Sequence, residues 1–259
     1  EPATGATRDG VAGGNRWTMT FQQLPVLSCT GLTKTYGAPP TLTTALDHVS
    51  LDLFAGESVA VMGPSGSGKS TLLHCLAGIL VPDAGHVLLS GAGTPVDVAS
   101  LKAEQRAALR RERFGFVFQQ GLLLPELTAG ENVALPLMLA GMPRAEAETQ
   151  AAGWLAHLGL AGLDSRRLGE LSGGQAQRVA IARSQVGSTQ VTFADEPTGA
   201  LDQHTSREVL EALLGATVGR GRTLVVVTHD ENVASMCSRT VRLQDGRVVS
   251  DTADLGGVA

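Results

Sequence analysis

The sequence predicts an α/β fold in which helices cover a parallel sheet. Short apolar runs, typical of buried strands, occur at residues 58–62, 115–118, 191–194 and 223–227. Helical patterns of apolar residues occur at 71–80, 144–158 and 206–214. Buried strands that alternate with helices are typical of a parallel sheet. The 259 residues, 43% of them hydrophobic and 17% charged, are enough for one globular domain with a sizeable core.

Further elements are predicted in chain order. We expect residues 1–24 to be a flexible N-terminal extension or an expression remnant, and residues 25–259 to form the folded domain. Alternation of apolar and polar residues predicts a half-buried strand over 49–53, and residues 239–250 predict a hairpin around Gln244, Asp245 and Gly246. A helical, loop-rich insert is expected at about 125–170.

Composition excludes several classes of protein. The net charge of −5 disfavours a nucleic-acid surface over the whole domain. The one arginine cluster, at 106–113, is accompanied by Glu104 and Glu112 and predicts a solvated helix face. Three cysteines without C-x-x-C spacing indicate neither a zinc site nor a disulfide framework. No apolar run reaches the ~18 residues of a membrane span, and the first residues lack the pattern of a signal peptide.

A glycine-rich stretch follows the predicted strand 58–62. It matches the phosphate-loop pattern G-x-x-x-x-G-K-[ST] between a strand and a helix. In such a loop backbone N–H groups bind phosphate oxygens, Lys69 reaches the β- and γ-phosphates, and the Ser70 hydroxyl binds Mg²⁺. The alternative, a Gly/Ser loop that caps an ordinary helix, is disfavoured because lysine is scarce in this chain. The predicted nucleotide contacts are Gly63, Pro64, Ser65, Gly66, Ser67, Gly68, Lys69, Ser70 and Thr71.

Two carboxylates end the predicted strand 191–194. Asp195 and Glu196 would lie at the sheet edge where parallel α/β proteins bind ligands, beside the phosphate loop. We expect Asp195 to hold Mg²⁺ and Glu196 to polarise the water that attacks the γ-phosphate. Taken alone, such a pair would more often be a solvated turn. Thr192 is a polar residue within this apolar strand.

Residues 171–183, Leu-Ser-Gly-Gly-Gln-Ala-Gln-Arg-Val-Ala-Ile-Ala-Arg, resemble the signature motif of ATP-binding-cassette (ABC) ATPases. Gln119, after the strand 115–118, resembles the Q-loop glutamine of this family, and Gln120 is the alternative for that role. Residues 200–202 resemble the D-loop, and His229 resembles the switch histidine. Tyr36 resembles the aromatic residue that stacks on adenine. The resemblance runs from about residue 27 to 249, with all motifs in the family's order.

The resemblance implies the ABC-ATPase fold of P-loop NTPases, with a parallel core sheet, an antiparallel β subdomain and a helical subdomain. It implies a nucleotide-binding domain with ATP and Mg²⁺ as cofactors, in a head-to-tail dimer that encloses two ATP. The implied catalytic residues are Glu196, His229, Gln119 and Lys69. The implied metal ligands are Ser70, Gln119 and Asp195. Further nucleotide contacts are implied for Tyr36, Ser172, Gly173, Gly174, Gln175 and Asp202.

The resemblance also implies the ATPase subunit of a bacterial transporter, at the cytoplasmic face of the membrane. We expect a permease on a separate chain, a second ATPase subunit that is a copy of this one, and no nucleic acid. Residues 115–133 and 194–202 look most like macrolide exporters, lipoprotein-release ATPases and cell-division ATPases, which favours export or mechanical transmission. The alternatives are a soluble cassette protein that acts on DNA or ribosomes and a cassette that does not hydrolyse ATP. The sequence does not indicate the transported substrate.

Overall fold

The structure, a computed structural model, describes residues 24–38, 40–91, 93–119 and 121–253. The predicted extension therefore lies outside the described residues, except for residue 24. The strands are β1 (Leu27–Tyr36), β2 (Thr43–Leu53), β3 (Ser58–Met62), β4 (Ala84–Gly91), β5 (Gly93–Asp97), β6 (Phe114–Phe118), β7 (Val191–Asp195), β8 (Thr223–Val227), β9 (Arg239–Gln244) and β10 (Arg247–Asp251). The α-helices are α1 (Lys69–Leu76), α2 (Ala103–Arg113), α3 (Ala129–Leu139), α4 (Arg144–His157), α5 (Gly173–Gln185), α6 (Gln203–Ala216) and α7 (Glu231–Ser235).

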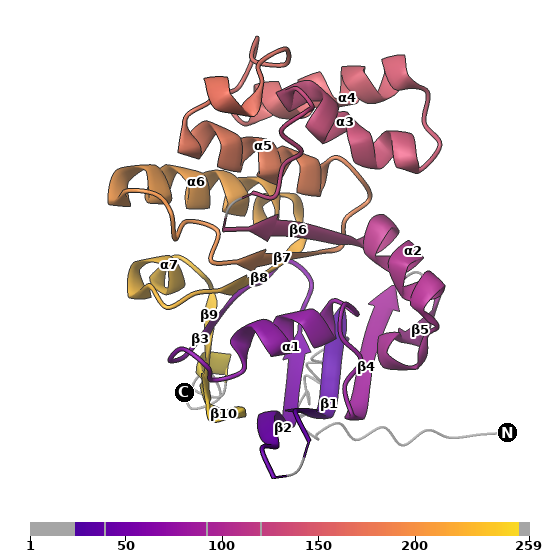
Figure 1. The fold of residues 1–259 in the computed structure, drawn as a ribbon, viewed down its shortest axis with the longest axis vertical. Coiled ribbons are helices and arrows are strands. Elements are labelled where there is room, and N and C mark those ends of the chain that lie inside the picture. The colour runs from indigo at the N-terminus through magenta and orange to yellow at the C-terminus, as the bar shows by residue number, and fades with distance from the viewer. Residues whose placement is uncertain (1–23, 39, 92, 120, 254–259) are drawn as a thin grey trace, which may run out of the picture.

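A mainly parallel sheet forms the centre of the molecule, as predicted (Figure 1). Its strand order is β10-β9-β3-β8-β7-β6, and only β10 runs antiparallel to its neighbour. The predicted hairpin is confirmed as β9 and β10. Every residue of β3 and β8 is buried, which explains why both strands are continuous apolar runs in the sequence. The carboxyl ends of these parallel strands define one edge of the sheet.

A second, antiparallel sheet has the order β2-β1-β4-β5. Helix α1 lies between the two sheets (Figure 1), and leucines from α1 and from both sheets belong to one hydrophobic core. The predicted half-buried strand is confirmed within β2, where Val49, Leu51 and Leu53 are buried. The fold is therefore the predicted α/β class with an antiparallel β subdomain.

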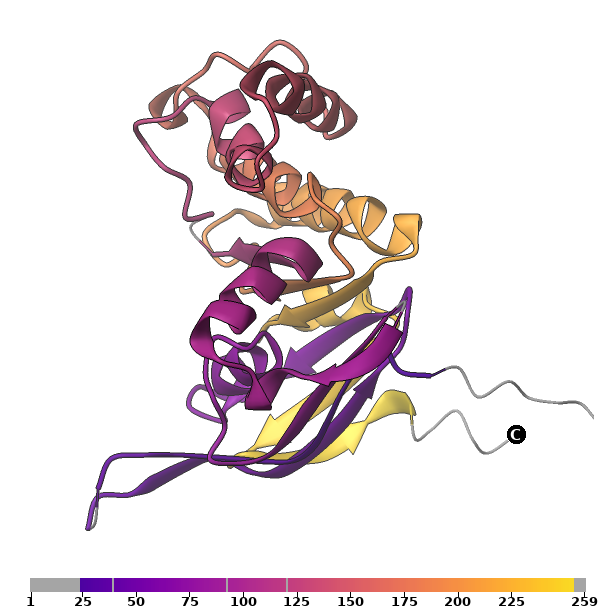
Figure 2. The same cartoon turned by 90° about the vertical axis from the view of Figure 1, so that its right-hand side faces the viewer.

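Helices α5 and α6 cover the other face of the parallel sheet, and α3 and α4 pack beyond them on α5 (Figure 2). We refer to α3 and α4, both within the predicted insert, as the helical lobe. Helix α3 begins at a capping box, because Thr128 Oγ1 accepts from the Glu131 backbone N–H at 3.2 Å and Glu131 Oε2 accepts from the Thr128 N–H at 3.0 Å. The lobe packs on α5, the helix that begins within the signature motif.

Two sequence predictions need correction. The helix expected over 71–80 ends at Leu76, because Gly78 adopts a φ of +63° and the Ile79 and Leu80 N–H groups both donate to the His74 carbonyl. The arginine-rich segment is helix α2, but its face is only partly solvated. Arg110 is half-buried and donates to the Gly78 carbonyl at 2.7 Å. The guanidinium of Arg106 likewise donates to a backbone carbonyl, that of Leu101.

A buried polar network accounts for Thr192, the second residue of β7. Gln185, at the end of α5, donates from Nε2 to Thr192 Oγ1 at 2.7 Å. Arg222 donates to the Gln185 carbonyl oxygen and to its Oε1, at 3.0 and 2.8 Å. The guanidinium of Arg222 also lies 5.8 Å from the ring centroid of Trp154 on α4, and that of Arg220 lies 4.5 Å from it. The two arginines thus join the helical lobe to the segment before β8.

None of the helices among the described residues combines the length and apolar character needed to cross a membrane.

Candidate functional site

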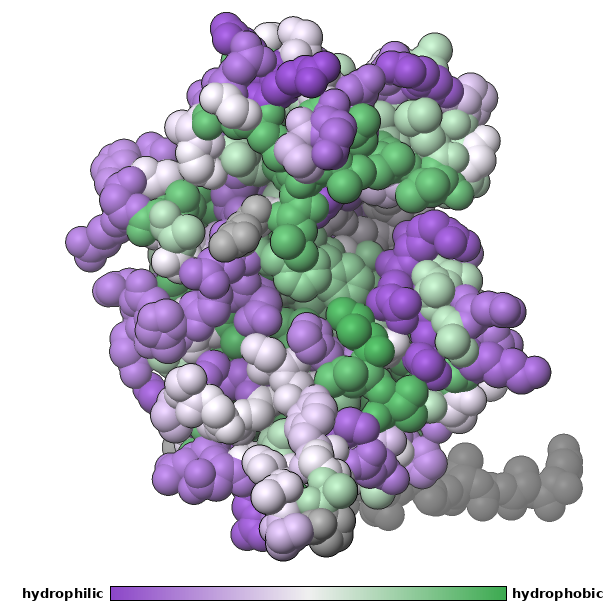
Figure 3. All heavy atoms as spheres, in the orientation of Figure 1, coloured by the Kyte–Doolittle hydropathy of each residue, from purple (hydrophilic) through white to green (hydrophobic). Residues whose placement is uncertain are grey.

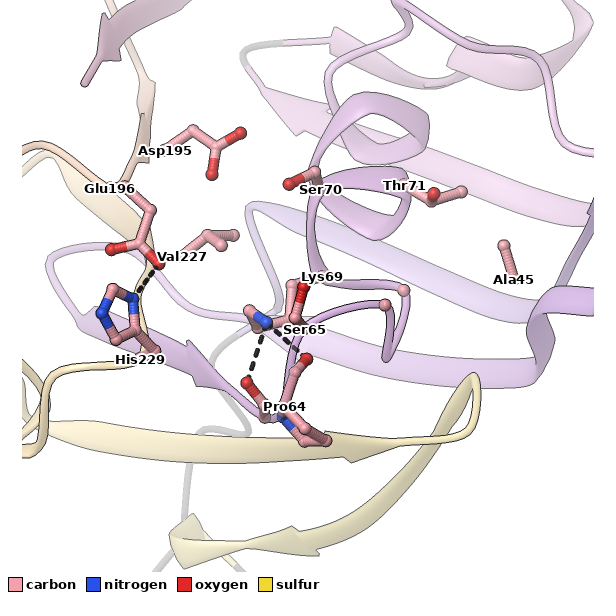
Figure 4. Close-up of a pocket in the computed structure, with 13 residues that line it drawn as sticks. Ala45, Pro64, Ser65, Lys69, Ser70, Thr71, Asp195, Glu196, Val227 and His229 are labelled. Atoms are coloured by element: carbon pink, nitrogen blue, oxygen red, sulfur yellow. Dashed lines mark hydrogen bonds and ion pairs between the residues drawn. The ribbon is translucent and has the colours of Figure 1, made fainter. Parts of the chain in front are cut away.

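The predicted phosphate loop lines a cleft of about 600 Å³ at the carboxyl end of β3 (Figure 4). Lys69 opens helix α1 and points back over the loop, where its ammonium donates to the carbonyl oxygens of Gly63 and Pro64, both at 2.8 Å. The cleft is lined by Ala45, Gly63, Pro64, Ser65, Gly66, Gly68, Lys69, Ser70, Thr71, Asp195, Glu196, Val227 and His229.

Glycine is required at two positions of this loop. Gly63 has a φ of +151°, and a Cβ there would lie 2.1 Å from the Leu243 carbonyl oxygen of β9. Gly68 has a φ of +101°, and a Cβ there would lie 2.2 Å from the Ala45 carbonyl oxygen. The loop is therefore packed against the backbone of two other segments, and only its inner side faces the cleft.

Two carboxylates face the loop from the end of β7. Asp195 is half-buried and burial raises its pKa, while the Ser70 hydroxyl opposite it acts in the other direction. Glu196, the next residue, has a φ of +45°, and its N–H donates to the Val227 carbonyl at 2.9 Å. Sequence reasoning predicted this pair, and the structure places both carboxylates in the cleft.

His229 follows β8 and lies beside Glu196. Its Nδ1 is 2.7 Å from Glu196 Oε1, and the Thr228 hydroxyl lies 3.4 Å from Glu196 Oε2. Hydrogen bonding to Glu196, together with the charge of that carboxylate, raises the pKa of His229. The His229 side chain is 74% exposed, whereas that of Glu196 is 23% exposed, so the imidazole covers the carboxylate from the solvent side.

Tyr36 lies at the border of the cleft. Its hydroxyl is 3.5 Å from Thr71 Oγ1, and the Lys34 ammonium lies 6.0 Å from the centroid of its ring. The tyrosine therefore lies beside the start of α1, next to the phosphate loop, and the residue is 42% exposed.

Other predicted residues do not line this cleft. Gln119 directly follows β6, whose last residue Phe118 pairs with Asp195, but the Gln119 amide lies against Gly199. Its rival, Gln120, lies outside the described residues. Asp202 caps α6, accepting from the Thr205 N–H at 3.0 Å and its hydroxyl at 2.6 Å. The signature residues Ser172, Gly173, Gly174 and Gln175 form the start of α5, away from the cleft.

The start of α5 is a second exposed helix N-terminus. The Ser172 N–H donates to Gln175 Oε1 at 2.9 Å, and Ser172 Oγ accepts from the Gln175 N–H at 3.2 Å. Gly174 allows close packing, because a Cβ there would lie 2.5 Å from Thr205 Cγ2 of α6. Ser172 and Gly173 are exposed, so they are open to a partner outside this chain.

Three residues of the site were not predicted. Ala45 and Val227 line the cleft, and Thr228 contacts Glu196. Thr228 could have been found from its place between a buried strand and His229. Ala45 carries no chemical signal, since its backbone rather than its side chain contacts the loop at Gly68.

A protein-family model described as ABC transporter matches residues 46–199, which contain the phosphate loop, the signature motif and both carboxylates. The chain belongs to the ABC transporter family. Its cleft and fold are those of an ATPase domain of this family.

Relatives of this ABC domain come from several bacteria. The lipoprotein-releasing system ATP-binding protein LolD of Geobacter metallireducens is 47% identical over 87% of this chain and 99% of its own length. The macrolide export ATP-binding/permease protein MacB of Hyphomonas neptunium is 43% identical over 89% of this chain. The chain spans only 35% of that MacB protein and a similar share of other export proteins that it matches.

The fold agrees with solved ABC structures. The dimeric structure of the ATP-binding cassette MJ0796 in a post-hydrolysis state, bound to ADP and Pi, has a TM-score of 0.78. That match has 38% sequence identity and covers 87% of this chain and 97% of the other.

Proposed function

We propose that this ABC domain binds Mg²⁺-ATP in the phosphate-loop cleft and hydrolyses it to drive a membrane permease. The observation that carries the proposal is one cleft in which the Lys69 loop faces Asp195, Glu196 and His229. A cation, a helix N-terminus and a paired acid and base are the groups that phosphoryl transfer requires.

The donors at the cleft fit a magnesium ion bound together with phosphate. Ser70 and Asp195 offer oxygen ligands from opposite sides, which is the chemistry that Mg²⁺ prefers. Burial disfavours the charged form of the Asp195 carboxylate, so a cation at this place would relieve that cost. When bound, Mg²⁺ would neutralise charge on the phosphates. Gln119 would have to turn from Gly199 to join these ligands.

We assign residues of the cleft separate roles in ATP hydrolysis. Lys69 and the loop N–H groups would hold the β- and γ-phosphates. Glu196 would accept a proton from the attacking water, and its 2.7 Å contact with His229 fixes the direction of the carboxylate. With Nδ1 donating to Glu196, His229 would donate from Nε2 towards the γ-phosphate only in its protonated form, which the raised pKa of His229 favours.

We further propose that two copies of the domain share two ATP molecules head to tail. The exposed start of α5 supports this arrangement, because Ser172 and the glycine N–H groups would form a second anion site, and they do not line the cleft of their own chain. Tyr36 would stack on adenine at the border of the cleft. Asp202, which caps α6, would lie near the shared interface.

An apolar band supports a permease partner. Figure 3 shows hydrophobic residues gathered down the middle of one face, from the helical lobe towards α1. Exposed apolar side chains in the adjoining segments are those of Ile79, Val81, Leu122, Leu124, Met138 and Leu139. We propose that the permease docks there, at the cytoplasmic face of the membrane, in an export-type system as the relatives' names suggest. Relatives include proteins with and without a permease in the same chain, and we favour a separate one.

Replacing Glu196→Gln tests the catalytic assignment. The amide keeps the size of the side chain but cannot accept the proton, so we expect ATP binding to persist and turnover to fall by about 10²- to 10⁴-fold. Calorimetry measures the first quantity and phosphate release the second. Exposed Glu211→Gln on α6 is the matched control. Undiminished turnover in Glu196→Gln would refute the role of Glu196.

Crosslinking in the native host tests the partner. We expect the chain to be recovered with an integral membrane permease, and a substitution of Leu139→Asp in the apolar band to reduce that recovery while leaving ATP binding intact. Recovery of ribosomes or DNA in place of a membrane protein would support the soluble cassette protein and overturn the transport proposal.

A further inference from the structure

The β9–β10 turn has no place in the chemistry above, yet it packs directly under the phosphate loop. Its residue Gly246 is buried, although the tip of a hairpin is ordinarily exposed. The Gly246 N–H donates to the carbonyl of Ser67, inside the loop, at 3.1 Å. Three residues before Gly246, the Leu243 carbonyl oxygen lies so close to Gly63 that a Cβ on Gly63 would not fit. The hairpin therefore supports the loop from the side opposite the cleft.

The same turn holds the segment before the loop. The Gly246 carbonyl accepts from the Asp47 N–H at 2.9 Å, and a Cβ on Gly246 would lie 2.9 Å from the Ala45 carbonyl oxygen. That carbonyl in turn packs against Gly68, the residue before Lys69. Gly246 thus links the two backbones that enclose the phosphate loop.

An ion pair fastens this arrangement. Arg247, next to Gly246, donates from Nε and from a terminal nitrogen to Asp47 Oδ2 at 2.8 and 2.5 Å. The Nδ1 of His48 lies 2.5 Å from the other oxygen of Asp47. The pair lies outside the cleft, so it can act on the nucleotide only through the backbone segments that it holds, the phosphate loop and the segment of Ala45.

We propose that the β9–β10 turn and the Asp47–Arg247 pair form a brace that holds the phosphate loop in its binding conformation, which makes Asp47 and Arg247 positioning residues for the nucleotide phosphates. The proposal rests on the function proposed above. Because Arg247 is 70% exposed, its ion pair contributes little to global stability, and its effect should appear in nucleotide affinity.

Calorimetric titration of the whole chain with Mg²⁺-ATP and with ADP tests the brace. We expect Arg247→Gln and Asp47→Asn each to raise both dissociation constants by about 2- to 5-fold, the size of effect that one exposed ion pair can transmit. The double variant should bind no more weakly than either single one, because the two residues act as a unit. Turnover at saturating ATP and the melting temperature without nucleotide should stay at wild-type values. Arg247→Lys should restore most of the affinity.

Arg242→Gln is the matched control, because Arg242 lies on the same hairpin but its side chain pairs with Glu231 of α7 and not with the segment before the loop. Gly246→Ala should weaken nucleotide binding more than the ion-pair variants, since its Cβ must displace the Ala45 carbonyl. Circular dichroism checks that this variant is folded. The brace would be overturned if Arg247→Gln and Asp47→Asn bound nucleotide with wild-type affinity. It would also be overturned if the losses of affinity added up in the double variant, or if Arg242→Gln lost as much affinity. If the wild-type chain itself fails to bind ATP, the proposed function fails instead.

Discussion

Glu196 adopts a backbone conformation that residues with side chains seldom occupy. Its φ of +45° lies in the left-handed region, which costs of order 1 kcal/mol or more for such a residue. The N–H bond to Val227 and the contacts with His229 and Thr228 hold it there. The fold thus uses some of its stability to aim one carboxylate into the cleft, as strained residues at functional sites commonly do.

The Glu196–His229 pair predicts a pH dependence at the residue scale. The pKa of His229 is raised above its ordinary value of about 6.5 by the carboxylate, so the folded state holds the imidazole proton more tightly than the unfolded state. The stabilisation is complete below about pH 6.5 and is lost as pH rises through the folded pKa. In Glu196→Gln the pKa of His229 should fall. NMR titration of the His229 ring measures this shift, and an unchanged titration curve would contradict it.

Residues whose proposed role belongs to the side chain could be predicted from the sequence, and residues that contribute only backbone atoms could not. Lys69, Asp195, Glu196 and His229 were predicted from the chemistry that their side chains offer, and all four line one cleft. Ala45 was missed because its contact with the loop is a carbonyl oxygen, which every residue possesses.

Strand β7 contains one buried polar residue, Thr192, whose hydroxyl accepts a hydrogen bond from Gln185. Thr192→Val removes the acceptor of the 2.7 Å bond from Gln185, which leaves a buried amide hydrogen short of a partner. We expect a loss of about 1–2 kcal/mol in the free energy of unfolding, measured with urea. Thr149→Val on the exposed face of α4 is the control and should change stability by less than about 0.5 kcal/mol. A variant as stable as the wild type would show that the Gln185 amide finds another partner.

The buried parallel strands were predicted well, and the antiparallel sheet was not located residue by residue. Strands β3 and β8 are apolar at every position because both faces are covered. Strand β1 has shifts of register with both neighbours, so its buried residues do not alternate regularly and give no period of two. The end of α1 was placed too late because Ile79 and Leu80 continue the apolar pattern after Gly78 has broken the backbone.

At the scale of the whole molecule, the start of α5 predicts an intermolecular site. Ser172→Arg should leave the ATP affinity of isolated subunits unchanged, because Ser172 does not line the cleft. Combined with Glu196→Gln, it should block dimer formation in the presence of ATP. Introduced alone, it should abolish turnover, because a bulky cation would fill the second anion site. Gel filtration with ATP measures the dimer. The exposed Ser235→Arg on α7 is a control. Dimers in Ser172→Arg would refute the shared site.

The stacking of Arg220 on Trp154 makes Trp154 an intrinsic fluorescence probe of the helical lobe. Trp154 belongs to the helical lobe and Arg220 to the segment before β8, and the other tryptophan, Trp17, lies outside the described residues. A guanidinium over the face of an indole polarises its π electrons, so a rotation of the lobe that separates the two groups would alter the colour and intensity of its emission. Fluorescence of the Trp17→Phe variant would then report, without an attached dye, whether the lobe moves when nucleotide binds.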